Sequence, residues 1–129
     1  MAEQPPKRIL VVDDEAPVRA ICSRMLTPQG YVVETEENAD RAIIRFKENP
    51  FDLVITDYSM PGELNGLTFG QAIREHSPHT QIILMTAYPA VDTAVATLRM
   101  GGFDYLVKPF DQKELTQRVH ACFAQQPLP

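Results

Sequence analysis

Short apolar runs alternate with amphipathic segments along most of the chain. Residues 8–12 form a run rich in β-branched side chains that ends abruptly at an acidic pair, which is typical of a strand buried on both faces of a parallel sheet. In residues 16–29 the apolar positions recur every three or four residues, which predicts an amphipathic helix. The same patterns predict strands at 31–35, 53–56, 81–85 and 105–107, and helices at 38–49, 67–75, 91–100 and 112–124.

Residues with special backbone preferences support these boundaries. Pro17 suits the first turn of a helix, where a missing N–H costs nothing, and Gly30 suits the cap at a helix end. Asn38 can cap the next helix, which Asn49-Pro50 then ends. The strict alternation of strands and helices predicts an α/β fold: a parallel sheet with helices on both faces and right-handed crossovers.

Length and charge narrow the class of protein. The chain has 129 residues, 44% of them hydrophobic and 22% charged, which is ordinary for one globular domain. We expect that domain at 7–124, with a flexible arm at 1–6 and a tail or linker stub at 125–129. The net charge of −5 argues against direct nucleic-acid binding. The sequence contains neither an apolar run of membrane-spanning length nor a signal peptide, so we expect a cytoplasmic location.

The cysteines and histidines suggest no separate site. Cys22 and Cys122 fall far apart in predicted helices, without a CxxC motif or a Cys/His cluster, so we interpret them as small apolar core residues. His76, His79 and His120 have no ligand partners at helical spacing, and we assign them no chemistry.

The polar residues at the predicted strand ends carry the functional information. Asp13 and Asp14 follow the first strand, Asp57 the third, Thr86 the fourth and Lys108 the fifth. The carboxyl ends of parallel strands meet at one edge of the sheet, where ligands bind beside the point at which the strand order reverses. Crowded carboxylates resist ionisation unless a cation joins them, and an all-oxygen site suits Mg²⁺. Taken singly these residues are ordinary caps, turn residues or surface charges; taken together they predict a metal-dependent site.

Four motifs follow one another along the chain: Val12-Asp13-Asp14-Glu15, Thr56-Asp57-Tyr58-Ser59-Met60-Pro61, Thr86-Ala87 and Tyr105-Leu106-Val107-Lys108-Pro109-Phe110. In order and spacing they resemble the response-regulator receiver domain of two-component signalling. The resemblance covers nearly the whole chain. It implies a flavodoxin-like, doubly wound sheet with the strand order 2-1-3-4-5.

The same resemblance implies the roles of the site residues. Asp13 (or Asp14) and Asp57 would contact Mg²⁺, with the backbone carbonyl of Ser59 as a further ligand. Asp57 would be the nucleophile that becomes an acyl phosphate, while Lys108 would neutralise charge.

A switch is also implied. Thr86 would donate its hydroxyl to the phosphoryl group, and Tyr105 would then rotate inward and repack the face made by the fourth helix, fifth strand and fifth helix. A cis peptide bond is expected between Lys108 and Pro109.

The resemblance also implies partners. The phosphoryl donor would be a histidine kinase or a histidine phosphotransfer domain, and the receiver would act on an output domain or protein. A homodimer through the face made by the fourth helix, fifth strand and fifth helix is a further possibility. We expect the chain to catalyse its own phosphorylation and dephosphorylation without turning over an external substrate.

Two alternative functions compete with the receiver interpretation. A haloacid-dehalogenase-type phosphatase would need an Asp two residues after the nucleophile, where this chain has Ser59. A nucleotide-binding or purely structural domain is disfavoured because no glycine-rich phosphate loop follows the first strand.

The sequence departs from the family's pattern at two places. The stretch 61–66 is one residue longer than the family's usual spacing. Ser59 and the bulky Tyr88 flank the path of a hydrolytic water, so we expect an acyl phosphate that lasts well beyond seconds.

Overall fold

The computed structural model describes residues 5–59, 65–87 and 104–124. The strands are β1 (Arg8–Val12), β2 (Val32–Glu36), β3 (Leu53–Asp57), β4 (Gln81–Thr86) and β5 (Asp104–Val107). The helices are α1 (Ala16–Leu26), α2 (Ala39–Glu48), α3 (Gly66–His76) and α5 (Gln112–Ala124), with a short 3-10 turn at Thr27–Gln29. The helix expected at 91–100, Tyr88 and most of the lengthened loop at 61–66 lie outside the described residues.

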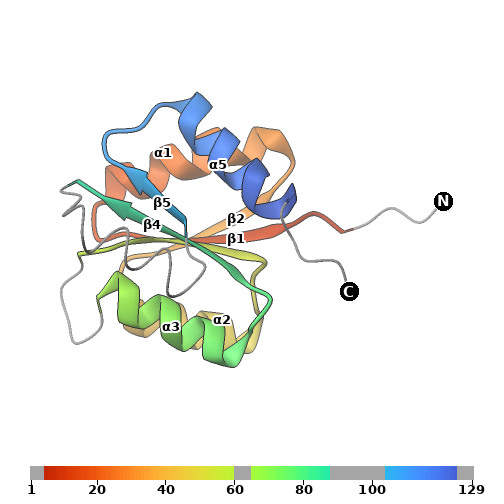
Figure 1. Cartoon of the computed structure of the whole chain (residues 1–129), viewed down its shortest axis with the longest axis vertical. Coiled ribbons are helices and arrows are strands. Elements are labelled where there is room, and N and C mark those ends of the chain that lie inside the picture. The colour runs from red at the N-terminus through yellow and green to blue at the C-terminus, as the bar shows by residue number, and fades with distance from the viewer. Residues whose placement is uncertain (1–4, 60–64, 88–103, 125–129) are drawn as a thin grey trace.

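The five strands form one parallel sheet in the order β2-β1-β3-β4-β5, which confirms the predicted fold class (Figure 1). All of β3 and most of β1 are buried, as the apolar runs predicted, because helices cover both faces of the sheet. The chain runs outward from β1 to β2 and then crosses to β3 on the other side. The strand order therefore reverses between β1 and β3, which is where an open sheet of this kind leaves a binding crevice.

Alternate side chains of each strand enter different cores. Helices α1 and α5 cover one face of the sheet, and α2 and α3 cover the other (Figure 1). Ile9 and Val11 pack with the α1–α5 layer, whereas Leu10 and Val12 pack with the α2–α3 layer. This two-residue period follows from the strand geometry, and it gives each face of the sheet its own apolar core.

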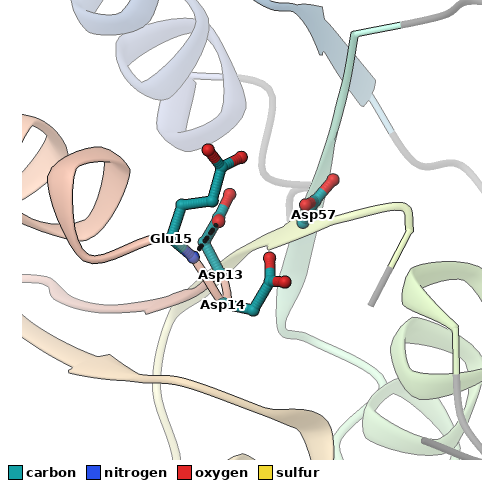
Figure 2. Close-up of side chains that lie close together, drawn as sticks. All are labelled: Asp13, Asp14, Glu15 and Asp57. Atoms are coloured by element: carbon teal, nitrogen blue, oxygen red, sulfur yellow. Dashed lines mark hydrogen bonds between the residues drawn. The ribbon is translucent and has the colours of Figure 1, made fainter. Parts of the chain in front are cut away.

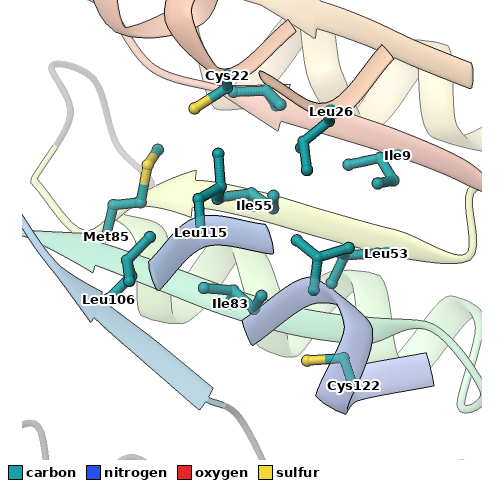
Figure 3. Packing of buried hydrophobic residues seen from close by; sticks show 12 residues of the cluster. Ile9, Cys22, Leu26, Leu53, Ile55, Ile83, Met85, Leu106, Leu115 and Cys122 are labelled. Atoms are coloured by element: carbon teal, nitrogen blue, oxygen red, sulfur yellow. The ribbon is translucent and has the colours of Figure 1, made fainter. Parts of the chain in front are cut away.

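Both cysteines are apolar core residues, as the sequence indicated. Cys22 and Cys122 are free and buried in the α1–α5 layer among Leu26, Leu115 and their neighbours (Figure 3). Burial raises the pKa of each thiol to about 12, so both remain protonated and poorly nucleophilic at neutral pH.

The helix boundaries follow the predicted signals with one correction. The Asn38 side chain accepts a hydrogen bond from the Arg41 N–H, and Gly30 takes the left-handed conformation with φ 98°. The helix predicted to reach residue 29 ends as an α-helix at Leu26, and a 3-10 turn follows. Pro28 explains the change, because it has no N–H with which to continue the α-helical hydrogen bonds. None of the helices within the described ranges is long and apolar enough to cross a membrane.

Candidate functional site

Four carboxylates gather at the carboxyl end of the sheet. Asp13, Asp14 and Glu15 follow β1, and Asp57 ends β3 beside them (Figure 2). One ligand oxygen from each of the four lies within 4.8 Å of the others. We call these four residues the acidic cluster. It forms at the point where the strand order reverses, so the carboxylates that the sequence predicted to converge do lie together.

Asp13 fixes the turn between β1 and α1. Its side chain is fully buried, its Oδ1 accepts a hydrogen bond of 2.8 Å from the Glu15 N–H, and its Oδ2 accepts one of 2.8 Å from Lys108 Nζ. Its own N–H donates to the carbonyl of Glu36 at the end of β2. Because both of its carboxylate oxygens already accept hydrogen bonds, Asp13 serves as an organiser of the turn, whereas Asp14 presents an exposed carboxylate.

Lys108 brings a positive charge into the acidic cluster from the end of β5. Its ammonium nitrogen lies 2.8 Å from Asp13 Oδ2, 3.3 Å from Asp57 Oδ2 and 3.7 Å from Glu15 Oε1. The Lys108–Pro109 peptide bond is cis, as expected. The Lys108 N–H donates to the carbonyl of Thr86, so the end of β5 is held against the end of β4.

The charges of this site are not balanced. Four carboxylates face one ammonium, and burial raises the pKa of the Asp57 carboxyl, with the charge of Asp13 adding to the effect and Lys108 opposing it. Burial alone would lower the pKa of Lys108, but its hydrogen bond to Asp13 and the charges of Asp13 and Asp57 outweigh burial, and its pKa is raised. Lys108 is therefore a firmly charged ammonium that neutralises only part of the cluster.

The surplus of negative charge and the donor chemistry fit a hard divalent cation. Magnesium takes one or two protein carboxylates together with water, and it needs no sulfur or nitrogen ligand. Asp14 and Asp57 offer oxygens on facing elements, and the Ser59 N–H donates to Asp57 Oδ1 over 3.3 Å, which sets the backbone of residue 59 beside the same site. The residues present therefore fit Mg²⁺.

A close backbone contact holds Asp57 in place. The Gly66 N–H, at the start of α3, donates to the Tyr58 carbonyl over 2.8 Å. A Cβ added to Gly66 would overlap the Asp57 carbonyl oxygen and lie 2.7 Å from Tyr58 Cα. Asn65 and Thr68 form a capping box at the same helix start. The loop that begins after Ser59 thus returns to the backbone of β3 at a fixed point, and this requires glycine at position 66.

Thr86 and Tyr105 lie on one face of the sheet. Tyr105 pairs with Leu84 in the β4–β5 register, and Thr86 is two residues beyond Leu84 on β4, which places it on the same face. Tyr105 is half-buried and packs against the α2–α3 layer. This placement is compatible with communication between the end of β4 and Tyr105; their switching roles stay a prediction.

Sequence reasoning missed two side chains that complete the site. Glu15 reaches Lys108, and Arg19 donates from Nη1 to the Asp13 carbonyl over 2.7 Å. Glu15 continues the acidic pair and Arg19 follows one helical turn later, so their positions were visible. Their directions depend on the backbone of the β1–α1 turn, which the pattern of residues does not specify.

Comparison with known proteins agrees with this geometry. Residues 9–120 match the response regulator receiver domain. The chain belongs to the response regulator receiver domain family. The receiver is 40% identical over 121 residues to the regulatory protein AtoC of Escherichia coli, an alignment that covers 94% of this chain and 26% of AtoC. It is 34% identical to the transcriptional regulatory protein TcrA of Mycobacterium tuberculosis, covering 95% of this chain and 48% of TcrA.

Solved receivers share its fold. The receiver domain of NtrX from Brucella abortus superposes with a TM-score of 0.84 at 28% identity, covering 91% of this chain and 98% of that one. The chemotaxis response regulator CheY4 of Vibrio cholerae gives a TM-score of 0.82 at 28% identity, with the same coverage of both chains. This receiver therefore spans about a quarter to a half of the curated relatives named above, and nearly all of the single-domain structures.

Proposed function

We propose that this receiver accepts a phosphoryl group on Asp57, with Mg²⁺ bound beside it, from a histidine kinase or a histidine phosphotransfer domain. The observation that carries the proposal is the buried Asp57 carboxylate at the strand-order reversal, 3.3 Å from Lys108 and within the acidic cluster. Phosphoryl transfer requires alignment and charge neutralisation more than covalent chemistry from the protein, and a firmly charged ammonium with a divalent ion meets that requirement.

The proposed reaction is a nucleophilic displacement at phosphorus. An Asp57 carboxylate oxygen forms the new P–O bond, and the bond from phosphorus to the donor's imidazole nitrogen, or to the acyl oxygen of a small donor, breaks. The donor leaves with the electron pair of that bond. Magnesium, held by Asp14 and Asp57 with the Ser59 carbonyl, would offset charge on the phosphoryl oxygens.

Within this proposal Asp13 and Asp14 have different roles. Asp13 already accepts two hydrogen bonds, including one from Lys108, so it orients the turn and the ammonium and would contact the metal through water. Asp14 is exposed and already offers an oxygen near Asp57, so it would be the direct ligand. Asp14→Asn is expected to weaken Mg²⁺ binding more than it weakens the fold, whereas Asp13→Asn weakens both.

The names of the relatives suggest which process this receiver controls. AtoC is named as a regulatory protein and TcrA as a transcriptional regulatory protein, and this chain spans only part of each. We extend that role to the present chain as the cytoplasmic receiver of a transcription regulator. Thr86 contacts the phosphoryl group, and Tyr105 transmits the change to the β5–α5 surface, where an output domain, a partner protein or a second copy docks.

Labelling with a small acyl-phosphate donor tests the proposal. With Mg²⁺, the wild-type chain is expected to incorporate phosphate as a hydroxylamine-sensitive acyl phosphate, and Asp57→Asn is expected to incorporate none. Asp40→Asn is a matched control, because Asp40 is an exposed residue in the first turn of α2. Full labelling of the Asp57→Asn chain would refute the site, as would labelling that persists when Mg²⁺ is chelated.

A further inference from the structure

The turn between β1 and α1 is held from both sides. From the sheet, the Asp13 N–H donates to the Glu36 carbonyl over 3.2 Å. From the helix, Arg19 Nη1 donates to the Asp13 carbonyl oxygen over 2.7 Å, and the Arg19 side chain is partly buried. The peptide units on either side of the Asp13 Cα are therefore fixed by different partners, and the second of them links Asp13 to Asp14.

The orientation of that second peptide unit helps to set the direction in which the Asp14 side chain leaves the backbone. The β1–β2 register ends at the pair Val12 and Glu36, so the sheet ladder does not reach the Asp13 carbonyl. Glu15 caps α1 without a side-chain hydrogen bond to the helix, and the hydrogen bond from the Glu15 N–H to Asp13 Oδ1 fixes the next peptide unit, between Asp14 and Glu15. Among the described residues, the hydrogen bond that the Asp13 carbonyl accepts comes from the Arg19 guanidinium.

We propose that Arg19 is a positioning residue for the divalent-cation site. It fixes the peptide unit between Asp13 and Asp14, and so it keeps the Asp14 carboxylate facing Asp57. The inference rests on the proposed function, since it concerns the same metal. Residues that orient metal ligands without touching the metal commonly change metal affinity tenfold to about a hundredfold when they are removed.

The direction in which Mg²⁺ affinity changes when Arg19 is substituted distinguishes a positioning role from a purely electrostatic one. Arg19 carries a positive charge close to the acidic cluster, so as a charge alone it repels an incoming cation. Removing it would then tighten Mg²⁺ binding. If Arg19 instead positions Asp14, removing it weakens Mg²⁺ binding in spite of the more favourable electrostatics. The two roles thus predict opposite changes for one substitution.

The experiment compares Arg19→Met with Arg24→Met. Arg24 is an exposed residue in the last turn of the same helix, so its substitution removes the same charge from α1 without touching the turn. Calorimetric titration with Mg²⁺ alone is expected to give a dissociation constant about tenfold higher for Arg19→Met. Arg24→Met is expected to bind as the wild type does or slightly more tightly. Arg19→Lys retains a positively charged N–H donor group, with a different geometry, and should recover part of the loss.

A second readout needs no metal. In the metal-free chain, the Glu15 amide, which donates to Asp13 Oδ1, should exchange its hydrogen faster in Arg19→Met than in Arg24→Met, while both variants unfold at similar urea concentrations. Unchanged or tighter Mg²⁺ binding by Arg19→Met, or unchanged binding by Asp14→Ala, would overturn the inference and leave the metal site intact. Absence of Mg²⁺ binding by the wild type would instead overturn the proposed function on which the inference rests.

Discussion

Two groups of charged side chains lie beside β1, and they differ in their balance. The acidic cluster has four carboxylates, which face the Lys108 ammonium, while the Arg19 guanidinium binds the backbone carbonyl of Asp13. The second group, which we call the edge network, has two carboxylates and two guanidinium groups. It links the start of β1, the edge strand β2 and helix α2, and consists of Arg8, Glu34, Glu36 and Arg45.

The edge network is electrically complete within the protein. Arg8 Nη2 lies 2.7 Å from Glu34 Oε2, and Arg45 pairs with both Glu34 and Glu36. Arg8 also donates to the carbonyl of Pro50 and lies over the Phe51 ring, so it joins the α2–β3 connection to the sheet. Each charge has an opposite charge and a hydrogen bond, and this arrangement stabilises the edge of the sheet without needing a ligand.

Two carboxylates show the difference most directly. The hydrogen bond from Arg8 lowers the pKa of Glu34, whereas burial raises the pKa of Asp57. The fold therefore favours the ionised form of Glu34 and disfavours that of Asp57. A carboxylate kept ionised at a cost to the fold is typical of a functional site, where the missing counter-charge comes from a ligand.

The largest expected effect comes from removing the cation inside the acidic cluster. Lys108→Met leaves Asp13 buried without its ion-pair partner, and we expect the free energy of unfolding to fall by about 3 kcal/mol. The equivalent change in the edge network, Arg45→Met, should cost about 1 kcal/mol because that pair is partly solvated. Urea unfolding at neutral pH measures both, and equal losses would contradict the distinction between the two groups.

Adding Mg²⁺ to the same two variants tests whether the lost charge of Lys108 can be replaced. A divalent ion supplies positive charge where Lys108→Met removed it, so saturating Mg²⁺ should restore part of the lost stability of that variant. Arg45→Met should gain no more from Mg²⁺ than the wild type does. A Lys108→Met chain that Mg²⁺ stabilises less than it stabilises the wild type would mean that Lys108 arranges the carboxylates rather than offsets their charge.

A smaller effect of opposite sign is expected at Asp57. The raised pKa means that this carboxyl favours the fold in its protonated form, below the pKa of an unfolded Asp, and that this contribution is lost as the pH rises through the folded value. Above the folded pKa the ionised carboxylate is the less favoured form, so Asp57→Asn should raise the free energy of unfolding at neutral pH by about 1 kcal/mol in the absence of metal. The gain should shrink at about pH 3, and destabilisation at neutral pH would contradict the conclusion that the ionised Asp57 carboxylate is unfavourable in the metal-free fold.

The sequence predicted the positions of the main site residues better than their directions. Asp57 and Lys108 end strands of a parallel sheet, and topology alone brings such positions to one edge. Arg8 and Glu34 are 26 residues apart on neighbouring strands, and their pairing depends on a register that the apolar pattern leaves open. The close approach of Gly66 to β3 likewise depends on how α3 packs.

The smallest expected effect concerns the pH dependence of the edge network. Glu34 has a lowered pKa, so its ionised form stabilises the fold above the pKa of an unfolded Glu, and that contribution is lost as the pH falls through the lowered value. Glu34→Gln should therefore cost about 1 kcal/mol at neutral pH, and less in concentrated salt, because the network is partly exposed. The cost should disappear in acid.

Glu37→Gln is the matched control for this measurement. Glu37 pairs with Arg41 over 3.8 Å at a well-exposed position, so its substitution should change stability little at any pH. Urea unfolding of both variants across the acidic pH range measures the difference between their free energies of unfolding. A Glu34→Gln penalty that persists unchanged in acid would assign it to packing. The edge network would then no longer be the balanced counterpart of the acidic cluster, and the contrast between the pKa values of Glu34 and Asp57 would lose its meaning for stability.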